Sequence, residues 1–509
     1  MSAAMPLREI LRGVALRGAP ADPAWGDRLV SGIEYDSRRV SSGDLFFAFA
    51  GARVDGRSFA KQALSRGACA VVSELPSIDE LARDWFQVEH GRKALALASG
   101  KFLHHPDQRV LFTGVTGTNG KTTTAYLIDA ILRHAGRITG MIGTIEYRVA
   151  NETRVAVNTT PESLDVLRLA SELETRGGTH LTMEVSSHAL ALARVHGYRF
   201  HTAVFTNLTR DHLDFHQTME AYSAAKRLLF QPEAGDGPAW AVLNADDPAS
   251  SSMTPVSSHA NVLWYGLAAH ADLRAESVRS DFNGLHFDLS YRGQRQPLHS
   301  PLVGAFNVSN ILAASGAALS YGLALPQIAD GITACRSVPG RFERVDVGQP
   351  FLVVVDYAHT DDALRNTIQA ARNLLRQQKH GRLITLFGCG GDRDRTKRPL
   401  MGAAAAEGSD FVVLTSDNPR SEDPLDIMND VMVGLRRFDT PLVAEPGRAK
   451  AIERAIAEAK SGDIVLLAGK GHEPYQILKD RTIDFDDRAT ARGILGVLGY
   501  GPHVERGSK

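Results

Sequence analysis

Short apolar runs alternate with amphipathic stretches along the middle of this chain. Runs of this kind have the length of buried strands and are bounded by polar or turn-forming residues: Val110–Phe112, Leu181–Val185, Ala203–Asn207 and Trp240–Leu243. Strands that are apolar on both sides are typical of a parallel sheet covered by helices. The pattern therefore predicts an α/β domain in the middle of the chain.

The same alternation returns in the last third of the chain and predicts a second, smaller doubly wound sheet. Its predicted strands are Phe351–Val355, Leu383–Phe387, Phe411–Leu414 and Ile464–Leu467. Between the two sheets, residues 261–302 carry short alternating segments around Asn283-Gly284, the strongest short-range hairpin signal. We expect a small antiparallel excursion there, followed by a helix over residues 304–319.

Turn-forming residues at 104–107 and 337–340 divide the chain. We predict an N-terminal α/β domain over residues 1–103, a central domain with a parallel sheet over 104–336, and a C-terminal Rossmann-like domain over 337–509. A chain of 509 residues exceeds what one hydrophobic core usually supports, which agrees with several domains. We expect the polar tail, residues 501–509, to be disordered.

Composition narrows the class of partner. The 57 basic and 58 acidic residues nearly balance, which argues against a broad nucleic-acid surface. Cys69, Cys335 and Cys389 lie far apart and give neither a disulfide framework nor metal-ligand spacing. No apolar run has the length of a membrane span, and the N-terminus lacks the pattern of a signal peptide. We expect a cytoplasmic protein with small-molecule partners, bound to neither nucleic acid nor membrane.

The segment Gly117-Thr118-Asn119-Gly120-Lys121-Thr122-Thr123 follows the first central run and precedes a helix that we expect to begin near Thr124. Glycines let backbone amides approach phosphates, a lysine reaches the terminal phosphates, and a hydroxyl can bind Mg²⁺. The segment predicts a phosphate-binding loop for ATP or GTP, although Val115 stands where the general pattern has glycine.

Candidate ligands follow the next two central strands. Glu184 ends a strand and, with Thr122, could bind Mg²⁺; a capping or solvated glutamate is the alternative. His212 lies in a segment rich in polar residues and is a candidate ligand of a second metal ion, whereas His216 is expected to be a hydrogen-bonded structural residue. From its pattern alone, Lys226 would be an ordinary surface lysine.

Three polar clusters follow predicted strands of the C-terminal sheet: Gly388–Arg395, Ser416–Arg420 and Gly469–Glu473. Ligands of such sheets bind beyond the carboxyl ends of the strands. Arginines bind carboxylates with two hydrogen bonds, and Glu473 could hold an ammonium group. The clusters predict a site for a zwitterionic, amino-acid-like ligand; the alternative is that each is a solvated loop.

These motifs, in this order, resemble the Mur ligase family, the ATP-dependent enzymes that build the peptide of bacterial cell-wall precursors. The resemblance covers almost the whole chain and rests on Asp36-Ser37-Arg38 with Gly43–Phe46, Gly117–Thr123, Asn158–Pro161, Glu184–His188, Thr206–Asp214, Gly304–Asn307, Pro339–Glu343, Asp356–His359, Asp417–Arg420 and Gly469–Glu473. The chain is most similar to members that add the third amino acid, diaminopimelate or lysine, to UDP-N-acetylmuramoyl-L-Ala-D-Glu.

The resemblance implies an N-terminal UDP-binding α/β domain and a central P-loop ATPase-like sheet, and it implies the site residues below. The UDP-sugar dipeptide would be held by Ser37, Arg53, Asn158, Thr159, Thr160, Ser186 and Arg194. ATP would be held by Gly114, Thr116, Gly117, Thr118, Asn119, Gly120, Lys121, Thr122, Asn307, Arg341 and Asp356. The amino acid would be held by Arg393, Asp417, Asn418, Pro419, Arg420, Gly469 and Glu473.

The catalytic residues that the resemblance implies are Lys121, Glu184, His212 and Lys226. It also implies that Lys226 is carbamylated and binds Mg²⁺ together with Thr122, Glu184 and His212, which reverses its interpretation as a surface residue. The expected cofactors are ATP and Mg²⁺, and the expected protein is a monomer. Two positions depart from the family: Leu192 replaces a substrate-contacting Gln of some members, and Thr360-Asp361 replaces a common Thr-Pro, which we expect to change only a loop.

The choice of amino acid can be predicted from charge. Diaminopimelate carries a carboxylate at the end where lysine has none, and the family's diaminopimelate-adding members carry the tetrapeptide Asp417-Asn418-Pro419-Arg420. A buried Arg420 left unpaired by lysine would cost several kcal/mol. We therefore favour meso-diaminopimelate, with the lysine-adding form as the alternative.

Two rival functions are a folate polyglutamylating ligase and a nucleotide-binding switch. The first would lack the N-terminal UDP-sugar segment, residues 1–103. The second would have no use for three amino-acid-binding clusters.

Overall fold

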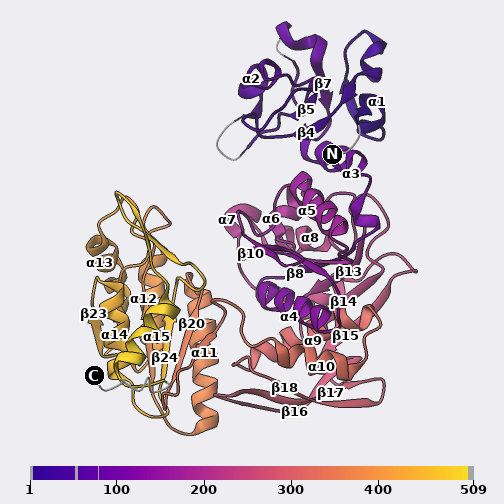
Figure 1. Ribbon diagram of the computed structural model, residues 1–509. Helices are drawn as coiled ribbons and strands as arrows, with labels where there is room; N and C mark the ends of the chain where they lie inside the picture. Colours follow the sequence, from indigo (N-terminus) through magenta and orange to yellow (C-terminus); the bar gives the residue numbers. More distant parts are fainter. Residues whose placement is uncertain (1–3, 52–54, 78, 502–509) are drawn as a thin grey trace, which may run out of the picture. The chain divides into compact units, whose positions relative to one another are not determined.

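The computed structural model describes residues 4–51, 55–77 and 79–501, and the chain divides into two compact units. Unit 1 comprises residues 1–274 and 312–331, and unit 2 comprises residues 275–311 and 332–509 (Figure 1). Each unit is described by itself below. The fold is α/β throughout, as predicted.

The first sheet of unit 1 is built from the N-terminal part of the chain. Its strands, in spatial order, are β2 (Leu16–Gly18), β7 (Trp85–Val88), β6 (Ala70–Ser73), β5 (Asp44–Phe47) and β4 (Gly32–Glu34). All neighbours are parallel except β2 and β7. The accompanying elements are β1 (Met5–Pro6), which pairs with β3 (Leu29–Val30), and the helices α1 (Leu7–Ile10), α2 (Ala60–Ser65) and α3 (Gly91–Phe102). Short 3₁₀ turns η1 to η4 complete this part: Pro23–Asp27, Gly56–Phe59, Asp79–Asp84 and Pro106–Gln108.

The second sheet of unit 1 has the predicted parallel strands at its centre. In spatial order the strands are β11 (Glu152–Val155), β10 (Glu146–Val149), β9 (Thr139–Ile142), β12 (His180–Glu184), β8 (Leu111–Thr116), β13 (Phe200–Phe205), β14 (Trp240–Asn244) and β15 (Asn261–Gly266). Only β9, β10 and β11 form antiparallel pairs in this series. The helices that accompany this sheet within unit 1 are α4 (Lys121–His134), α5 (Ser163–Thr175), α6 (Ser187–Ala191), α7 (Leu213–His216) and α8 (Met219–Arg227), with the 3₁₀ turn η5 (Pro248–Met253).

The prediction for residues 261–302 was partly wrong. Asn261–Gly266 is a parallel strand beside β14 and extends the central sheet, with Leu263 and Tyr265 buried. The strands on either side of Asn283-Gly284 are β16 (Leu273–Asp281) and β17 (Gly284–Tyr291), which are neighbours in the sheet, as the turn signal predicted. β17 also pairs antiparallel with β18 (Gln294–Ser300). The predicted helix is α9 (Phe306–Ser320), and α10 (Leu325–Ala334) follows it.

Unit 2 contains the predicted doubly wound sheet. In spatial order its strands are β19 (Glu343–Val345), β20 (Leu352–Asp356), β24 (Ile464–Ala468), β21 (Leu383–Phe387), β22 (Phe411–Leu414) and β23 (Leu442–Ala444). All neighbours are parallel except β19 and β20. Its helices are α11 (Asp361–Gln378), α12 (Lys397–Gly408), α13 (Pro424–Leu435), α14 (Arg448–Glu458) and α15 (Asp487–Val497), and β25 (Tyr475–Ile477) pairs with β26 (Thr482–Asp484).

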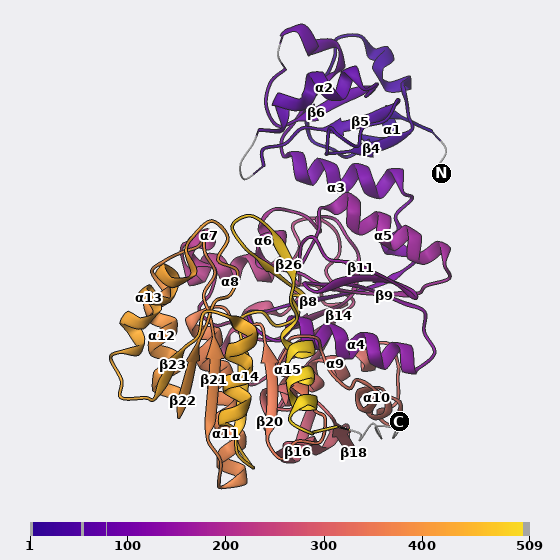
Figure 2. The ribbon, with the colours of Figure 1, turned by 60° about the vertical axis from the view of Figure 1, so that its left-hand side comes forward.

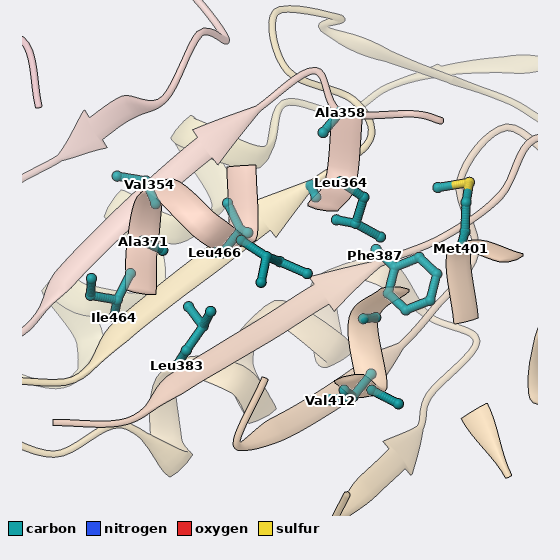
Figure 3. Packing of buried hydrophobic residues seen from close by; sticks show 14 of the residues in the cluster. Val354, Ala358, Leu364, Ala371, Leu383, Phe387, Met401, Val412, Ile464 and Leu466 are labelled. Atoms are coloured by element: carbon teal, nitrogen blue, oxygen red, sulfur yellow. The ribbon is translucent and has the colours of Figure 1, made fainter. Parts of the chain in front are cut away.

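Alternate residues of these strands face two separate cores. Leu383, Val412 and Leu466 pack on one side of the sheet against α11, α12 and α13 (Figure 3). Ile384 and Val465 pack on the other side against α14 and α15, which lie in front of the sheet in Figure 2. Because both faces are covered, the strands read as continuous apolar runs, and this explains why the sequence predicted them well.

Candidate active site

The phosphate-loop segment turns tightly between β8 and α4. Gly117 has φ +146°, and a Cβ atom there would lie 1.9 Å from Thr206 Oγ1, so only glycine fits. Val115 is buried within β8, so the loop begins after it and its departure from the general pattern does not touch the turn. Helix α4 begins at Lys121 after Gly120 at φ +87°, three residues earlier than predicted.

The loop is held by the end of β13. The amides of Thr118 and Asn119 donate to the carbonyl and side-chain oxygens of Asn207, at 2.8 and 2.9 Å. The Lys121 ammonium donates to the carbonyls of Gly117 and Thr118, at 3.0 and 2.8 Å. A cation is therefore built into a turn whose helix N-terminus favours negative charge.

Glu184 is buried at the end of β12, next to β8, and is not the solvated glutamate of the alternative interpretation. Its carboxylate accepts from Thr122 Oγ1 at 2.9 Å, from Thr144 Oγ1 at 3.1 Å and from the Thr144 amide at 2.8 Å. A hydroxyl and a carboxylate beside a phosphate loop are the oxygen ligands that Mg²⁺ prefers, so these residues fit the ion. Thr144 was missed from the sequence; its place directly after the strand at 139–142 was the available signal.

Lys226 on α8 is 1% exposed, which overturns its interpretation as a surface lysine. Its ammonium donates to the Gly117 carbonyl at 2.7 Å and lies 4.3 Å from the centre of the Tyr222 ring. Burial lowers the pKa of Lys226 well below its ordinary value, and the charge of Lys121 lowers it further. The alanines at 224 and 225 precede a lysine that faces the phosphate loop rather than solvent.

Three histidines gather near α6 and α7. His212 has φ +52°, and its ring centre lies 4.8 Å from that of His188. His216 is buried and hydrogen-bonded to Ser187 Oγ at 2.9 Å, as expected of a structural residue. Burial lowers the pKa of His188 to about 4, and His212 and His216 add to the effect, so His188 is neutral at neutral pH.

Among residues 4–51, 55–77 and 79–501, no three His, Cys, Asp or Glu side chains are grouped so that they could bind a metal ion. The predicted ligand set contains one carboxylate and one imidazole. A metal ion there would depend on oxygens from Thr122, from a modified Lys226 and from phosphate.

Most residues predicted to hold the UDP-sugar dipeptide form a connected group in unit 1. Thr160 Oγ1 donates to the Glu184 carbonyl at 2.8 Å and accepts from the Ser186 amide at 3.1 Å. Arg194 donates to the Thr160 carbonyl at 2.8 Å, and Thr159 contacts Thr144. Asn158 is exposed.

The N-terminal residues predicted for the same ligand are Ser37 and Arg53. Ser37 is buried and donates to Gln62 Oε1 at 3.0 Å. Arg53 lies outside the described residues.

In unit 2, the predicted nucleotide residues Arg341 and Asp356 lie together. Asp356 accepts from the amides of Phe342 and Ala358, at 2.7 and 2.9 Å. Burial raises the pKa of Asp356, and the nearby Arg341 charge opposes that rise. Asn307 is buried near the start of α9, where its side-chain Nδ2 donates to the Val303 carbonyl at 2.8 Å. Phosphate-loop residues Gly114, Thr116 and Gly117–Thr122 all lie in unit 1.

The three C-terminal clusters lie at the carboxyl ends of the adjacent strands β22, β21 and β24, as predicted. A Cβ atom on Gly469 would lie 2.8 Å from Asp417 Oδ2, and one on Gly391 would lie 1.9 Å from the Pro419 carbonyl. The clusters therefore pack directly on one another, which separate solvated loops would not do. Arg393 is exposed on the loop after β21.

Asn418 joins two of the clusters. Its Nδ2 donates to Glu473 Oε2 at 2.9 Å, and its Oδ1 accepts from the Ile477 amide at 3.0 Å and from Lys470 Nζ at 3.3 Å. Lys470 is buried and was not assigned a role from the sequence, although it stands within the Gly469–Glu473 cluster. Because two donors fix its oxygen, the Asn418 amide group is directed toward Glu473.

Arg420 corrects one expectation. It is half-buried rather than buried, and its Nη1 donates to the Gly391 carbonyl at 2.9 Å. Its backbone is in the left-handed region at φ +53°. The penalty for leaving this guanidinium without a carboxylate is therefore smaller than for a fully buried arginine, because a carbonyl already accepts from it.

Family models match three consecutive parts of the chain. They are described as "Mur ligase family, catalytic domain" (residues 29–102), "Mur ligase middle domain" (115–318) and "Mur ligase, glutamate ligase domain" (340–471). A relative from Solibacter usitatus is 62% identical over 98% of this chain and 99% of its own length. The chain therefore belongs to the Mur ligase family.

The Solibacter relative is named UDP-N-acetylmuramoyl-L-alanyl-D-glutamate--2,6-diaminopimelate ligase, as is a relative from Geobacillus thermodenitrificans. The second relative is 46% identical over 92% of this chain and 96% of its own. A solved structure with the same name is 32% identical, covers 98% of this chain and 100% of its own, and superposes with a TM-score of 0.71. The three-domain Mur ligase architecture agrees with the predicted fold class.

Proposed function

We propose that this chain is an ATP-dependent ligase that joins meso-diaminopimelate to the D-Glu γ-carboxylate of UDP-N-acetylmuramoyl-L-Ala-D-Glu. The observation that carries the proposal is the near full-length similarity, at 62% identity, to a ligase of that name. The phosphate loop of unit 1 and the amino-acid clusters of unit 2 supply the two kinds of site that such a reaction needs.

The proposed reaction has two steps. An oxygen of the γ-carboxylate attacks the γ-phosphorus of ATP, so that an acyl phosphate forms and ADP leaves. The neutral amine of diaminopimelate then attacks the acyl carbon, and the tetrahedral intermediate expels phosphate to leave the amide. Both steps concentrate negative charge on oxygens, so catalysis rests on positioning and charge compensation.

Lys121 would compensate charge on the terminal phosphates, because its ammonium already lies on the carbonyls of the phosphate loop. Backbone amides from Gly114 to Thr122 and the unit 2 residues Asn307, Arg341 and Asp356 would hold the rest of ATP. When bound, Mg²⁺ would neutralise phosphate oxygens, and Thr122, Glu184, His212 and carbamylated Lys226 would hold it.

Carbamylation of Lys226 would convert a buried ammonium into an anion. The amine attacks CO₂ only in its neutral form, and the lowered pKa of Lys226 increases that form. The product would carry two oxygens in place of a cation that lies on the Gly117 carbonyl.

The substrate residues are proposed from the similarity to the family. Ser37, Arg53, Asn158, Thr159, Thr160, Ser186 and Arg194 would hold the UDP-sugar dipeptide. Asn418 and Glu473 would orient the amino acid, Arg420 would bind its distal carboxylate, and Arg393, Asp417, Pro419 and Gly469 would complete that site. The domain division at residues 103/104 and 336/337 is proposed with it, since each family model falls within one of the three parts.

Location and oligomeric state stay predictions: a cytoplasmic monomer. Within the described part of the chain, no helix combines the length and hydropathy that crossing a bilayer requires.

The test is phosphate release with ATP, Mg²⁺ and the UDP-muramoyl dipeptide, with meso-diaminopimelate or L-lysine as acceptor. Release with diaminopimelate alone is the expected result. Release with lysine would still support a ligase but would contradict the proposed role of Arg420 in acceptor choice. Release with neither acceptor would favour the folate ligase or the nucleotide switch, which addition of a folate acceptor or of nucleotide alone would separate.

A further inference from the structure

A buried ion pair lies behind the amino-acid clusters of unit 2. Arg448 is the first residue of α14, and Asp487 is the first residue of α15. Both side chains are 0% exposed. Arg448 Nε donates to Asp487 Oδ1 at 2.8 Å, and Nη2 donates to Oδ2 at 2.6 Å. The guanidinium is thus fixed in orientation by a two-bond contact.

The same guanidinium also reaches two strand ends. Nη1 donates to the Ser416 carbonyl at 3.3 Å, and Nη2 donates to the Ala468 carbonyl at 3.1 Å. Ser416 directly precedes Asp417, and Ala468 directly precedes Gly469, so both carbonyls stand at the entrance of an amino-acid cluster.

The two strands that end at these carbonyls, β22 and β24, are not hydrogen-bonded to each other. β22 and β24 are separated in the sheet by β21, which pairs with both. A side chain as long as arginine, approaching from the helix layer, can join the two ends across the intervening strand. Burial opposes the charge on Arg448, but the carboxylate of Asp487 outweighs that effect and, with Asp417, raises the pKa of Arg448. The cation is therefore kept in place.

We infer that Arg448, held by Asp487, is a positioning residue for the incoming amino acid. It sets the separation of the loop that carries Asn418 from the loop that carries Glu473. This inference rests on the proposed function, since it concerns binding of the diaminopimelate acceptor. The contacts of Arg448 with the clusters are its hydrogen bonds to the Ser416 and Ala468 carbonyls. We propose no contact between Arg448 and the substrate.

A more exposed ion pair at the amino ends of the same strands provides a control; the Arg382 side chain is 36% exposed. Arg382 and Asp463 precede β21 and β24, and Arg382 Nη2 donates to Asp463 Oδ2 at 3.1 Å. Asp463 also accepts from the Arg382 amide at 2.7 Å. This pair links two strands at their amino ends, away from the clusters, and so reports the effect of an ion pair on stability alone.

The experiment compares Arg448→Lys and Asp487→Asn with Arg382→Lys in the full-length protein. KM is measured separately for meso-diaminopimelate, ATP and the UDP-muramoyl dipeptide, with Tm for each variant. We expect Arg448→Lys to raise KM for diaminopimelate about tenfold or more, because the two loops lose their common fixed point, while KM for ATP stays within about twofold. Asp487→Asn should have the same selectivity with a smaller rise. Arg382→Lys should change Tm without this split.

Three results would overturn the inference. They are an unchanged KM for diaminopimelate in folded Arg448→Lys, an equal rise of all three KM values, and unfolding of both Arg448→Lys and Asp487→Asn, which is the result of a purely structural pair. Each requires a wild-type protein that releases phosphate with diaminopimelate. A wild type inactive with that acceptor would instead reject the proposed function, and the inference with it.

Discussion

The phosphate loop of unit 1 and the amino-acid clusters of unit 2 both lie at the carboxyl ends of parallel strands, but they are held differently. The phosphate loop is one contiguous segment whose own cation, Lys121, lies on its carbonyls. The unit 2 clusters follow three strands: the buried Arg448 holds two of them from behind, and the buried Lys470 holds Asn418 from within its own cluster. A contiguous loop concentrates its function in a few residues, whereas a composite site distributes it. Single substitutions should therefore abolish activity in the phosphate loop and should weaken acceptor binding by different amounts in the unit 2 clusters.

The largest effect is expected from Lys121→Ala. Loss of the only loop ammonium leaves charge on the terminal phosphates uncompensated, so phosphate release should fall at least about a thousandfold. The measurement is ADP formation at saturating substrates. Lys93→Ala is the control, since Lys93 pairs with Glu233 on the surface and should leave the rate within about twofold. Turnover of Lys121→Ala within tenfold of the wild type would contradict the contrast between the two sites.

Lys226→Ala should follow, with a loss on the order of a hundredfold, because the proposed anionic ligand disappears. Depletion of CO₂ should lower wild-type activity and bicarbonate should restore it, the more readily as pH rises and the neutral amine becomes more populated. Labelled bicarbonate should appear on the wild type by NMR. Lys226→Arg keeps the cation and is the control that should neither respond nor take up label. A fully active wild type without label would reject the modification.

Arg420→Ala tests the composite site. The catalytic efficiency kcat/KM with meso-diaminopimelate should fall about a hundredfold, while that with L-lysine should change little, because only diaminopimelate offers a distal carboxylate. Kinetics with each acceptor measure the ratio. Arg365→Ala removes an exposed arginine that pairs with Glu407 away from the clusters and should preserve the preference. Equal losses with both acceptors would assign Arg420 to loop structure instead.

The smallest effect concerns stability. His180 is buried at the start of β12, at the other end of the strand from Glu184, and burial, with the charges of Arg137 and His201, lowers its pKa to about 4. In the unfolded chain the His180 imidazole has its ordinary pKa of 6.5 and is protonated more readily than in the folded protein. The contribution of neutral His180 to the free energy of unfolding is therefore fully present above pH 6.5 and is lost as pH falls toward 4. The loss is at most about 3 kcal/mol. Urea unfolding across this range measures it.

His180→Phe should flatten that pH dependence, since phenylalanine keeps a ring against Tyr321, whose centre lies 4.7 Å away. His270→Phe is the control, because His270 is exposed. An unchanged pH dependence in His180→Phe would show that other groups titrate on unfolding.

Burial on both faces favoured the prediction of a strand but did not ensure it, since β6 and β9 are buried at every residue and were missed. Leu383–Phe387 and Phe411–Leu414 were predicted with their observed bounds, because helices cover them on both sides. β10 and β11 were missed: each has four residues, with polar residues at two or three positions, although Tyr147 and Val149 of β10 are buried in a core. Thr360-Asp361 was expected to alter a loop, but Thr360 caps α11 and Asp361 opens its first turn.

The candidate site divides in the same way. The phosphate loop could be predicted because the residues that form it are consecutive in the sequence. The burial of Lys226 could not be predicted, because the alanines beside it allow either the lysine face or the opposite face of the helix to pack against the protein. Arg448 carries no signal in its own segment, since its partners Ser416, Ala468 and Asp487 lie 20 to 39 residues away in the chain.

The support provided by Arg448 also bears on how the family can change its substrate. The guanidinium holds carbonyl oxygens of Ser416 and Ala468, and every residue type supplies a carbonyl. The part of the scaffold that Arg448 holds therefore does not depend on the side chains at these positions, whereas Asn418 joins the clusters through its own side chain. A lineage could alter the amino acid incorporated into its cell wall through a few substitutions at the surface of the site, while the buried arginine behind it stayed unchanged.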